Sequence, residues 1–241
     1  MRKYLILLLS CFLITACIKS KVELEDLNTI CFKISERACD NAYRYKKYQD
    51  KEALALSFKQ CDSIIYGGCD VNAIGSAIHI KFNLYFWTKQ YKQALDEIEK
   101  LRTRDDIFWD ANFPSSTYYK LLIQTFWAND RGEIEERNHY IKQNIAFMDA
   151  CFNAYNEVKY ADIKKNLKEV DLADAEIHHV KKDYMSLVTY YSIKSLLYKK
   201  EDLLEEIKNI KVEKPLEEFY SLEDYIKKLD TNLYWKEENL F

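Results

Sequence analysis

The scarcity of chain breakers limits the fold of this sequence more than any other feature. Its 241 residues include four glycines and two prolines. β-Sandwiches and α/β enzymes use glycine at many turns, whereas glycine and proline are unfavourable inside helices. Hydrophobic residues make up 48% of the chain and aromatic residues 15%, which supports a packed core and argues against disorder. The sequence therefore predicts an all-α protein.

Helix caps, turn residues and amphipathic spacing divide the chain into segments. Asp50, Ser115 or Ser116, and Ser221 are suitable N-caps, and Gly67-Gly68 is an expected turn. Residues 104–114 are predicted to connect two helices, and Trp109 and Phe113 are expected to hold this connector in place by packing. The predicted helices span residues 22–33, 35–48, 51–62, 69 or 70 to 88, 91–102, 117–127, 133–148, 173–198, 203–210 and 222–228.

The N-terminal residues have the three-part layout of a secretory signal. Arg2 and Lys3 precede an apolar run over residues 4–13, which is shorter than the roughly 20 residues of a membrane span. Small residues then precede Cys17. Without further information, this pattern fits an ordinary cleaved signal with Cys17 as a structural cysteine, or a processing site at the cysteine itself.

The stretch Leu13 to Cys17 resembles the processing site of bacterial lipoproteins, which are cut before an acylated cysteine. The resemblance covers residues 2–17 and implies that Cys17 carries several acyl chains, including palmitate, which together anchor a protein stably. Ile18 stands after the cysteine where an Asp would change the sorting, so the resemblance implies the outer membrane, facing the periplasm. The expected domains are a signal peptide over residues 1–16, a lipidated cysteine and tether over 17–23, and a helical repeat domain over 24–241.

Five cysteines follow the anchor, and an oxidising compartment favours two disulfides among them. They are Cys31, Cys39, Cys61, Cys69 and Cys151. The first four form two pairs, each enclosing seven residues. Residues at that spacing lie about 12 Å apart on a straight helix, whereas a disulfide needs Cα atoms about 4.4–6.8 Å apart, so the chain must turn within each bonded pair. We predict Cys31–Cys39 and Cys61–Cys69 bonds; the alternatives are buried thiols or crosswise pairing. Cys151 is then a buried thiol, an intermolecular disulfide or a reactive group.

The segment Cys61 to Cys69 resembles the cysteine-rich, secreted branch of the Sel-like repeat family, together with the upstream residues Ala53, Ala55 and Phe58 and with Gly75 downstream. In that branch a cysteine ending one helix pairs with the cysteine that opens the next. The following hairpin resembles a tetratricopeptide repeat at Tyr85, Tyr91, Ala94, Ile98 and Leu101, although Phe82 and Asp106 depart from the motif. Both resemblances imply a helix-turn-helix repeat solenoid.

No strong catalytic or metal motif occurs in the sequence. It has no phosphate-binding loop, no Gly-x-Ser-x-Gly and no His-Glu-x-x-His. The four histidines are His79, His139, His178 and His179, and their nearby carboxylates form only two-residue pairs, whereas zinc needs three or four ligands. Glu133, Glu135 and Glu136 are expected to complement the start of a helix. We expect no catalytic residue, no metal site and no cofactor.

The charge balance and the missing motifs set the expected function. The chain has 36 basic and 39 acidic residues and a net charge of −3, which argues against a nucleic-acid partner. We expect a non-enzymatic scaffold or adaptor that binds a protein, such as an envelope protein, and is held in the bacterial envelope by its lipid. The resemblance to Sel-like lipoproteins implies an alternative, an immunity protein that neutralises an antibacterial toxin such as a phospholipase-like effector of type VI secretion.

Overall fold

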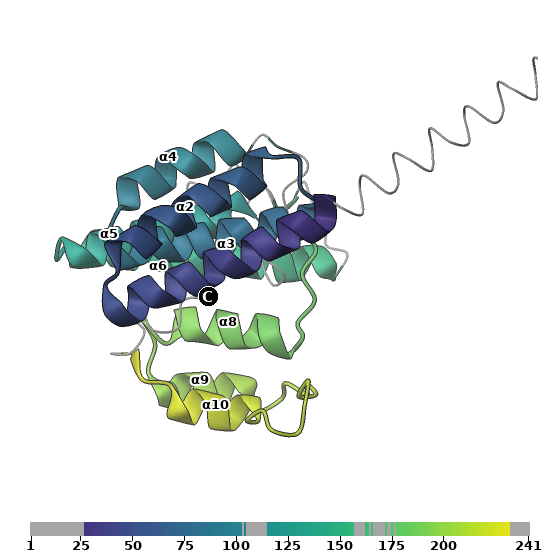
Figure 1. Ribbon diagram of the computed structural model, residues 1–241. Helices are drawn as coiled ribbons and strands as arrows, with labels where there is room; N and C mark the ends of the chain where they lie inside the picture. The colour runs from purple at the N-terminus through teal and green to yellow at the C-terminus, as the bar shows by residue number, and fades with distance from the viewer. Residues whose placement is uncertain are drawn as a thin grey trace, which may run out of the picture. The chain divides into compact units, whose positions relative to one another are not determined.

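A computed structural model describes residues 27–102, 104, 115–156, 162–163, 165, 172, 175 and 177–231. Within these ranges all regular secondary structure is helical, which confirms the all-α prediction (Figure 1). The chain forms two compact units that divide between residues 84 and 85. The predicted signal peptide, Cys17, the tether, Trp109 and Phe113 lie outside the described residues.

The first unit opens with one continuous helix over residues 27–48. The predicted division into two helices at Ser35 is wrong, because no glycine or proline interrupts this stretch. Helix α2 (Lys51–Tyr66) returns against it. The predicted cap is confirmed: the Asp50 carboxylate accepts hydrogen bonds from the backbone N–H groups of Glu52 and Ala53 at 3.1 and 3.0 Å. Helix α2 continues four residues beyond its predicted end.

Small side chains let the two helices of this first hairpin pack closely. Ala38 and Ala42 are buried on the first helix, and Ala53, Ser57 and Cys61 are buried on α2. The Ser57 hydroxyl donates to the carbonyl oxygen of Ala38 at 2.7 Å. The polar side chain buried between the two helices therefore has a hydrogen-bond partner. The burial follows from the spacing of small residues at every fourth position of α2.

A disulfide joins Cys31 to Cys69, whose Cα atoms lie 6.0 Å apart. The predicted Cys31–Cys39 and Cys61–Cys69 bonds are wrong, and one of the crosswise pairings is found instead. Cys31 and Cys39 share an uninterrupted helix, which keeps them too far apart to bond. Cys61 lies inside α2, and its side chain is buried in the hairpin.

Gly67 and Gly68 turn the chain from α2 into α3 (Val71–Trp87). A Cβ at Gly67 would lie 2.1 Å from the carbonyl oxygen of Ser63, and Gly68 has a φ of +79°, so both positions require glycine. The turn returns Cys69 to the start of the first helix. Asp70 then caps α3 by accepting from the N–H groups of the second and third helical residues, both at 2.9 Å.

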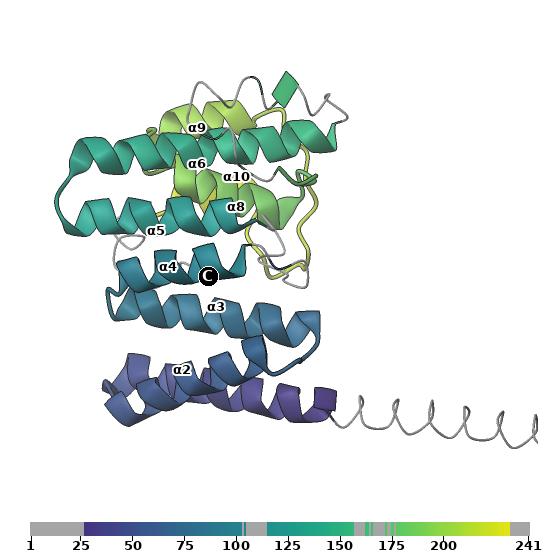
Figure 2. The ribbon, with the colours of Figure 1, turned by 90° about the horizontal axis from the view of Figure 1, so that it is seen from above.

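The second unit begins with three successive helices, α4 (Tyr91–Leu101), α5 (Ser116–Asp130) and α6 (Ile134–Tyr155). Helix α4 packs on α5, and α5 packs on α6 (Figure 2). The Tyr91 hydroxyl donates to the Asp130 carboxylate at 3.0 Å, which ties the start of α4 to the end of α5. The predicted cap at Ser115 is confirmed, since its hydroxyl accepts from the N–H of Thr117 at 3.1 Å.

Three shorter helices follow: α8 (Tyr184–Lys194), α9 (Lys200–Ile207) and α10 (Leu222–Lys228). The predicted single helix over residues 173–198 is wrong, since residues 177–183 are not helical. Two interactions, one with α6 and one at the helix start itself, explain the late start of α8. The N–H of Val180 donates to the carbonyl oxygen of Cys151 at 3.2 Å, and Asp183 caps α8 by accepting from the N–H of Ser186 at 3.0 Å.

Helix α8 packs on α6, and α10 packs on both α8 and α9. Ser221 caps α10, as predicted, by accepting from the N–H of Asp224 at 3.0 Å. In the part of the chain that the structure describes, no helix is both long enough and apolar enough to cross a bilayer.

Candidate binding groove

A hollow lined by described residues lies in the second unit, between α4, α5 and α6. We call it the α4–α6 groove; its volume is about 660 Å³. Its lining residues are Ile98, Glu99, Arg102, Ser116, Thr117, Lys120, Leu121, Gln124, His139, Tyr140, Gln143, Leu172 and Ala175. Three helices contribute side chains, so the groove exists only because α5 has a neighbour on each side.

The groove has an apolar floor and polar walls. Ile98 and Leu121 are 1% and 3% exposed and form part of the floor. Gln143 is also buried there, whereas Gln124 and Thr117 are half-buried. This pattern follows from the amphipathic spacing of the helices, in which apolar residues face the core and polar ones reach the rim. A hollow of this kind offers both apolar contact and hydrogen-bonding groups to a ligand.

One wall carries a charged cluster that bridges two helices. The Glu99 carboxylate of α4 lies 3.3 Å from Nε of Arg102 and 3.7 Å from Nζ of Lys120 on α5. All three side chains are about half exposed, so these pairs contribute little to stability. Two cations and one anion leave this wall with a net positive charge. The arrangement suits a ligand that brings a carboxylate to the groove.

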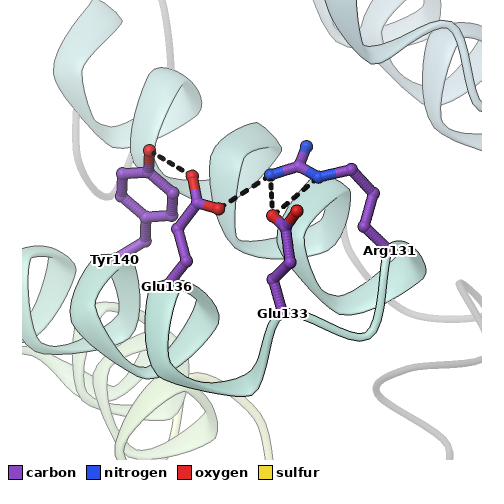
Figure 3. A network of polar contacts seen from close by, with 4 residues as sticks. All are labelled: Arg131, Glu133, Glu136 and Tyr140. Atoms are coloured by element: carbon purple, nitrogen blue, oxygen red, sulfur yellow. Dashed lines mark hydrogen bonds and ion pairs between the residues drawn. The ribbon is translucent and has the colours of Figure 1, made fainter.

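A second polar network borders the groove at the turn between α5 and α6. Figure 3 shows the Arg131 guanidinium between Glu133 and Glu136, with Tyr140 on the other side of Glu136. Arg131 donates to Glu133 and, at 2.9 Å, to Glu136, while the Tyr140 hydroxyl donates to Glu136 at 3.0 Å. The Arg131 guanidinium also lies 4.7 Å from the centroid of the Trp127 ring.

The hydrogen bonds and burial in this network shift the pKa values of its members. The hydrogen bond from Arg131 lowers the pKa of Glu133, and that same bond raises the pKa of Arg131. Burial, followed by the bond to Glu136, raises the pKa of Tyr140. At neutral pH, Arg131 and Glu133 are therefore held in their charged forms and Tyr140 in its neutral form. The predicted role of Glu133 and Glu136 at a helix start agrees with their position, and Arg131 was not anticipated as their partner.

The free cysteines differ in their surroundings. Cys39 is exposed, whereas Cys61 and Cys151 are buried. Burial raises the pKa of both Cys61 and Cys151 to about 12, so neither thiol ionises near neutral pH. Among the three interpretations of Cys151, the structure supports the buried thiol.

The histidines do not gather into one site. His139 is an exposed residue of the groove rim, and its ring lies 5.7 Å from the ring of Tyr140. His79 and His178 are half-buried, and His179 is exposed. Within the described residues, no group of three or more His, Cys, Asp or Glu side chains is placed to hold a metal ion. Sequence reasoning missed the groove because its members come from three helices and share no local motif.

A partly buried polar cluster joins α6, α8 and α9 elsewhere in this unit. The Tyr190 hydroxyl donates to Asp149 at 2.8 Å, and the Tyr191 hydroxyl donates to Glu206 at 3.1 Å. Lys194 donates to Glu206 at 2.5 Å and lies within 6 Å of the Tyr190 and Tyr191 ring centroids. Burial raises the pKa of Asp149 and of both tyrosines. Because each polar group has a partner, this cluster fastens three helices together rather than presenting reactive groups.

Comparisons of the chain with protein-family models, with curated proteins and with solved structures find no match.

Proposed function

We propose that the chain is a lipid-anchored scaffold or adaptor of the bacterial envelope that binds a protein segment in the α4–α6 groove without catalysing a reaction. The observation that carries the proposal is the composition of the groove. An apolar floor at Ile98 and Leu121 lies beneath half-exposed cationic side chains at Arg102 and Lys120. Such a surface fits a segment that carries an apolar anchor and an acidic residue.

The anchor and the repeat architecture are parts of this proposal. The resemblance of Leu13 to Cys17 to a lipoprotein processing site supports an acylated Cys17 at the periplasmic face of the outer membrane. The succession of α4, α5 and α6, each packed on the next, supports a helical repeat array. The buried thiols of Cys61 and Cys151, whose pKa burial raises to about 12, do not offer a nucleophilic thiolate.

Site-specific photo-crosslinking in cells tests the groove directly. A benzoyl-phenylalanine at Gln124, which lines the groove, is expected to give a discrete protein adduct, whereas the same probe at the exposed Glu201 of α9 gives none. Adding Arg102→Glu and Lys120→Glu should weaken the adduct about tenfold, because the wall reverses its charge. The matched control, Lys92→Glu on the exposed face of α4, should leave it unchanged.

The result separates the functional alternatives. No adduct at Gln124 above the level at Glu201 would overturn the groove as the binding site. Mass spectrometry of the adduct identifies the partner. An envelope protein supports the adaptor role, and a secreted antibacterial effector supports the immunity role.

A further inference from the structure

Large apolar side chains are exposed around one end of the first hairpin, the end that the Cys31–Cys69 disulfide closes. Ile30 and Phe32 flank Cys31 and are 53% and 62% exposed. Val71 is two residues beyond Cys69 and is 47% exposed. The disulfide brings Val71 to the same end as Ile30 and Phe32, although about forty residues separate Val71 from them in sequence. We call this surface the disulfide end.

The disulfide end is also where the chain from the proposed anchor arrives. Nine residues, 18–26, separate Cys17 from the first described helical residue. Fully extended, nine residues reach at most about 30 Å. Ile30 lies within one helical turn of residue 27, a rise of about 5 Å. The opposite end of the same helix, residue 48, lies about 30 Å along the axis from residue 27.

We propose that the disulfide end lies in the lipid–water interface of the membrane, with Ile30, Phe32 and Val71 among the headgroups and first acyl carbons. The proposal rests on the proposed lipid anchor at Cys17, and it adds a protein surface to that anchor. Interfacial helices bury their apolar side chains about 5–10 Å into this boundary. Ile30 and Phe32 lie only about 5 and 8 Å along the helix axis from residue 27, so a boundary of this thickness at the start of the helix includes both side chains. Tyr66, 57% exposed at the last position of α2, is the side-chain type that favours such interfaces.

The charges near this surface favour apolar over electrostatic binding. Lys33 is exposed beside Phe32, and the Asp70 carboxylate is engaged by two backbone N–H groups at the start of α3. The chain between Cys17 and residue 27 carries Lys19 and Lys21 but also three acidic residues. Binding should therefore persist on vesicles without anionic lipid and change little with salt.

Vesicle partitioning of the chain without its acyl groups tests this surface. The probe is the mature full-length chain, from residue 17, carrying Cys17→Ser, sedimented with vesicles of phosphatidylcholine alone. We expect measurable partitioning and an approximately tenfold loss in Phe32→Glu, because a charge replaces an apolar side chain in the interface. Leu56→Glu is the matched control: Leu56 is 48% exposed but lies near the opposite end of the hairpin, and its change should leave partitioning unaltered.

Hydrogen–deuterium exchange of the unaltered acylated chain gives a second readout, which does not depend on how Phe32→Glu folds. In vesicles, exchange of the backbone over residues 67–73 should slow relative to detergent, while exchange around the turn at Gln49 should not. Equal partitioning of Phe32→Glu and the parent chain, together with unchanged exchange over residues 67–73, would overturn the proposal. Light scattering that shows a dimer lost in Phe32→Glu would also overturn it and assign the surface to self-association.

The anchor itself is tested separately, by the mass of the Cys17 peptide. An unmodified Cys17 would refute the proposed function, whatever the vesicles show. An acylated Cys17 with no lipid contact at the disulfide end would refute this inference alone.

Discussion

At the scale of single residues, burial decides the chemistry of the cysteines. Cys61 and Cys151 are buried, and desolvation is the largest cause of their raised pKa values. The thiolate is the reactive form of cysteine, so these two thiols are protected in the folded chain. Cys39 is exposed on the first helix and lacks this protection.

We predict that an aromatic disulfide reagent modifies Cys39 at least about a hundredfold faster than Cys61 or Cys151 in the native protein. Burial keeps the reagent away from Cys61 and Cys151 and also keeps their thiols in the unreactive protonated form. In denaturant all three thiols should react alike. Stopped-flow absorbance measures the rates, and a Cys39→Ser variant identifies the fast phase. A fast phase that survives in Cys39→Ser would contradict the assignment.

The same two thiols give a prediction for alkaline pH. Their pKa is raised to about 12 in the folded state and is about 8.5 in an unfolded chain, so between these values the unfolded state loses protons that the folded state keeps. The free energy of unfolding therefore falls as pH rises above about 8.5. Urea unfolding at several pH values should show a smaller fall in Cys61→Ala/Cys151→Ala than in the parent. An equal fall in the free energy of unfolding would show that other titratable groups cause the pH dependence.

At the scale of helices, short polar side chains set where each element begins. Asp50, Asp70, Ser115, Asp183 and Ser221 each accept backbone N–H groups at a helix start. Three of these caps were predicted, because a cap and the helix that it serves are neighbours in sequence. Asp183 was missed because the preceding residues also have helical spacing, and a bond from Val180 to Cys151 keeps them out of the helix.

We expect Ser115→Ala to lower the free energy of unfolding by about 1 kcal/mol, since a buried cap of α5 is lost. Ser116→Ala, one residue further on, is the matched control and should change it by less than about 0.5 kcal/mol. Urea denaturation followed by circular dichroism measures both. Equal effects would show that the cap at Ser115 does not stabilise α5.

The disulfide of the first hairpin gives a second prediction at this scale. Cys31 and Cys69 are separated by 38 positions, so closing this loop is worth about 4 kcal/mol in the chain-entropy model. Cys31→Ser/Cys69→Ser should lose stability of this order, whereas Cys39→Ser should stay within about 0.5 kcal/mol of the parent. Peptide mapping without reduction checks the connectivity. A peptide that joins Cys31 to Cys39 would contradict it.

At the scale of the whole molecule, the proposed anchor links the compartment to the disulfide. An oxidising envelope permits the Cys31–Cys69 bond, and a lipid at Cys17 would hold the first hairpin near the bilayer. Among the described residues, the helix over residues 27–48 and α2 belong to the first compact unit, the division falls within α3, and α4 and the later helices belong to the second unit. Any role near the membrane thus begins with the first unit, and the α4–α6 groove belongs to the second.

We predict that Cys17→Ser abolishes incorporation of labelled palmitate and moves most of the protein from the membrane fraction to the soluble periplasmic fraction. Several acyl chains are needed for stable anchoring, so only the weak lipid contact proposed for the disulfide end would remain. Fractionation followed by immunoblotting measures the change, and Cys39→Ser is the control. Retention of Cys17→Ser in the membrane fraction after a salt wash would show a different mode of attachment.

The sequence by itself determined the helical class and most helix starts. The class follows from the shortage of glycine and proline, and the starts at Asp50, Ser115 and Ser221 follow from side chains that act within three residues. Only the tertiary structure decided the partner of Cys31, the late start of α8 and the α4–α6 groove. Each of these depends on which distant segments pack together, as when the Gly67-Gly68 turn returns Cys69 to the first helix. Packing is a property of the whole chain, and no local spacing encodes it.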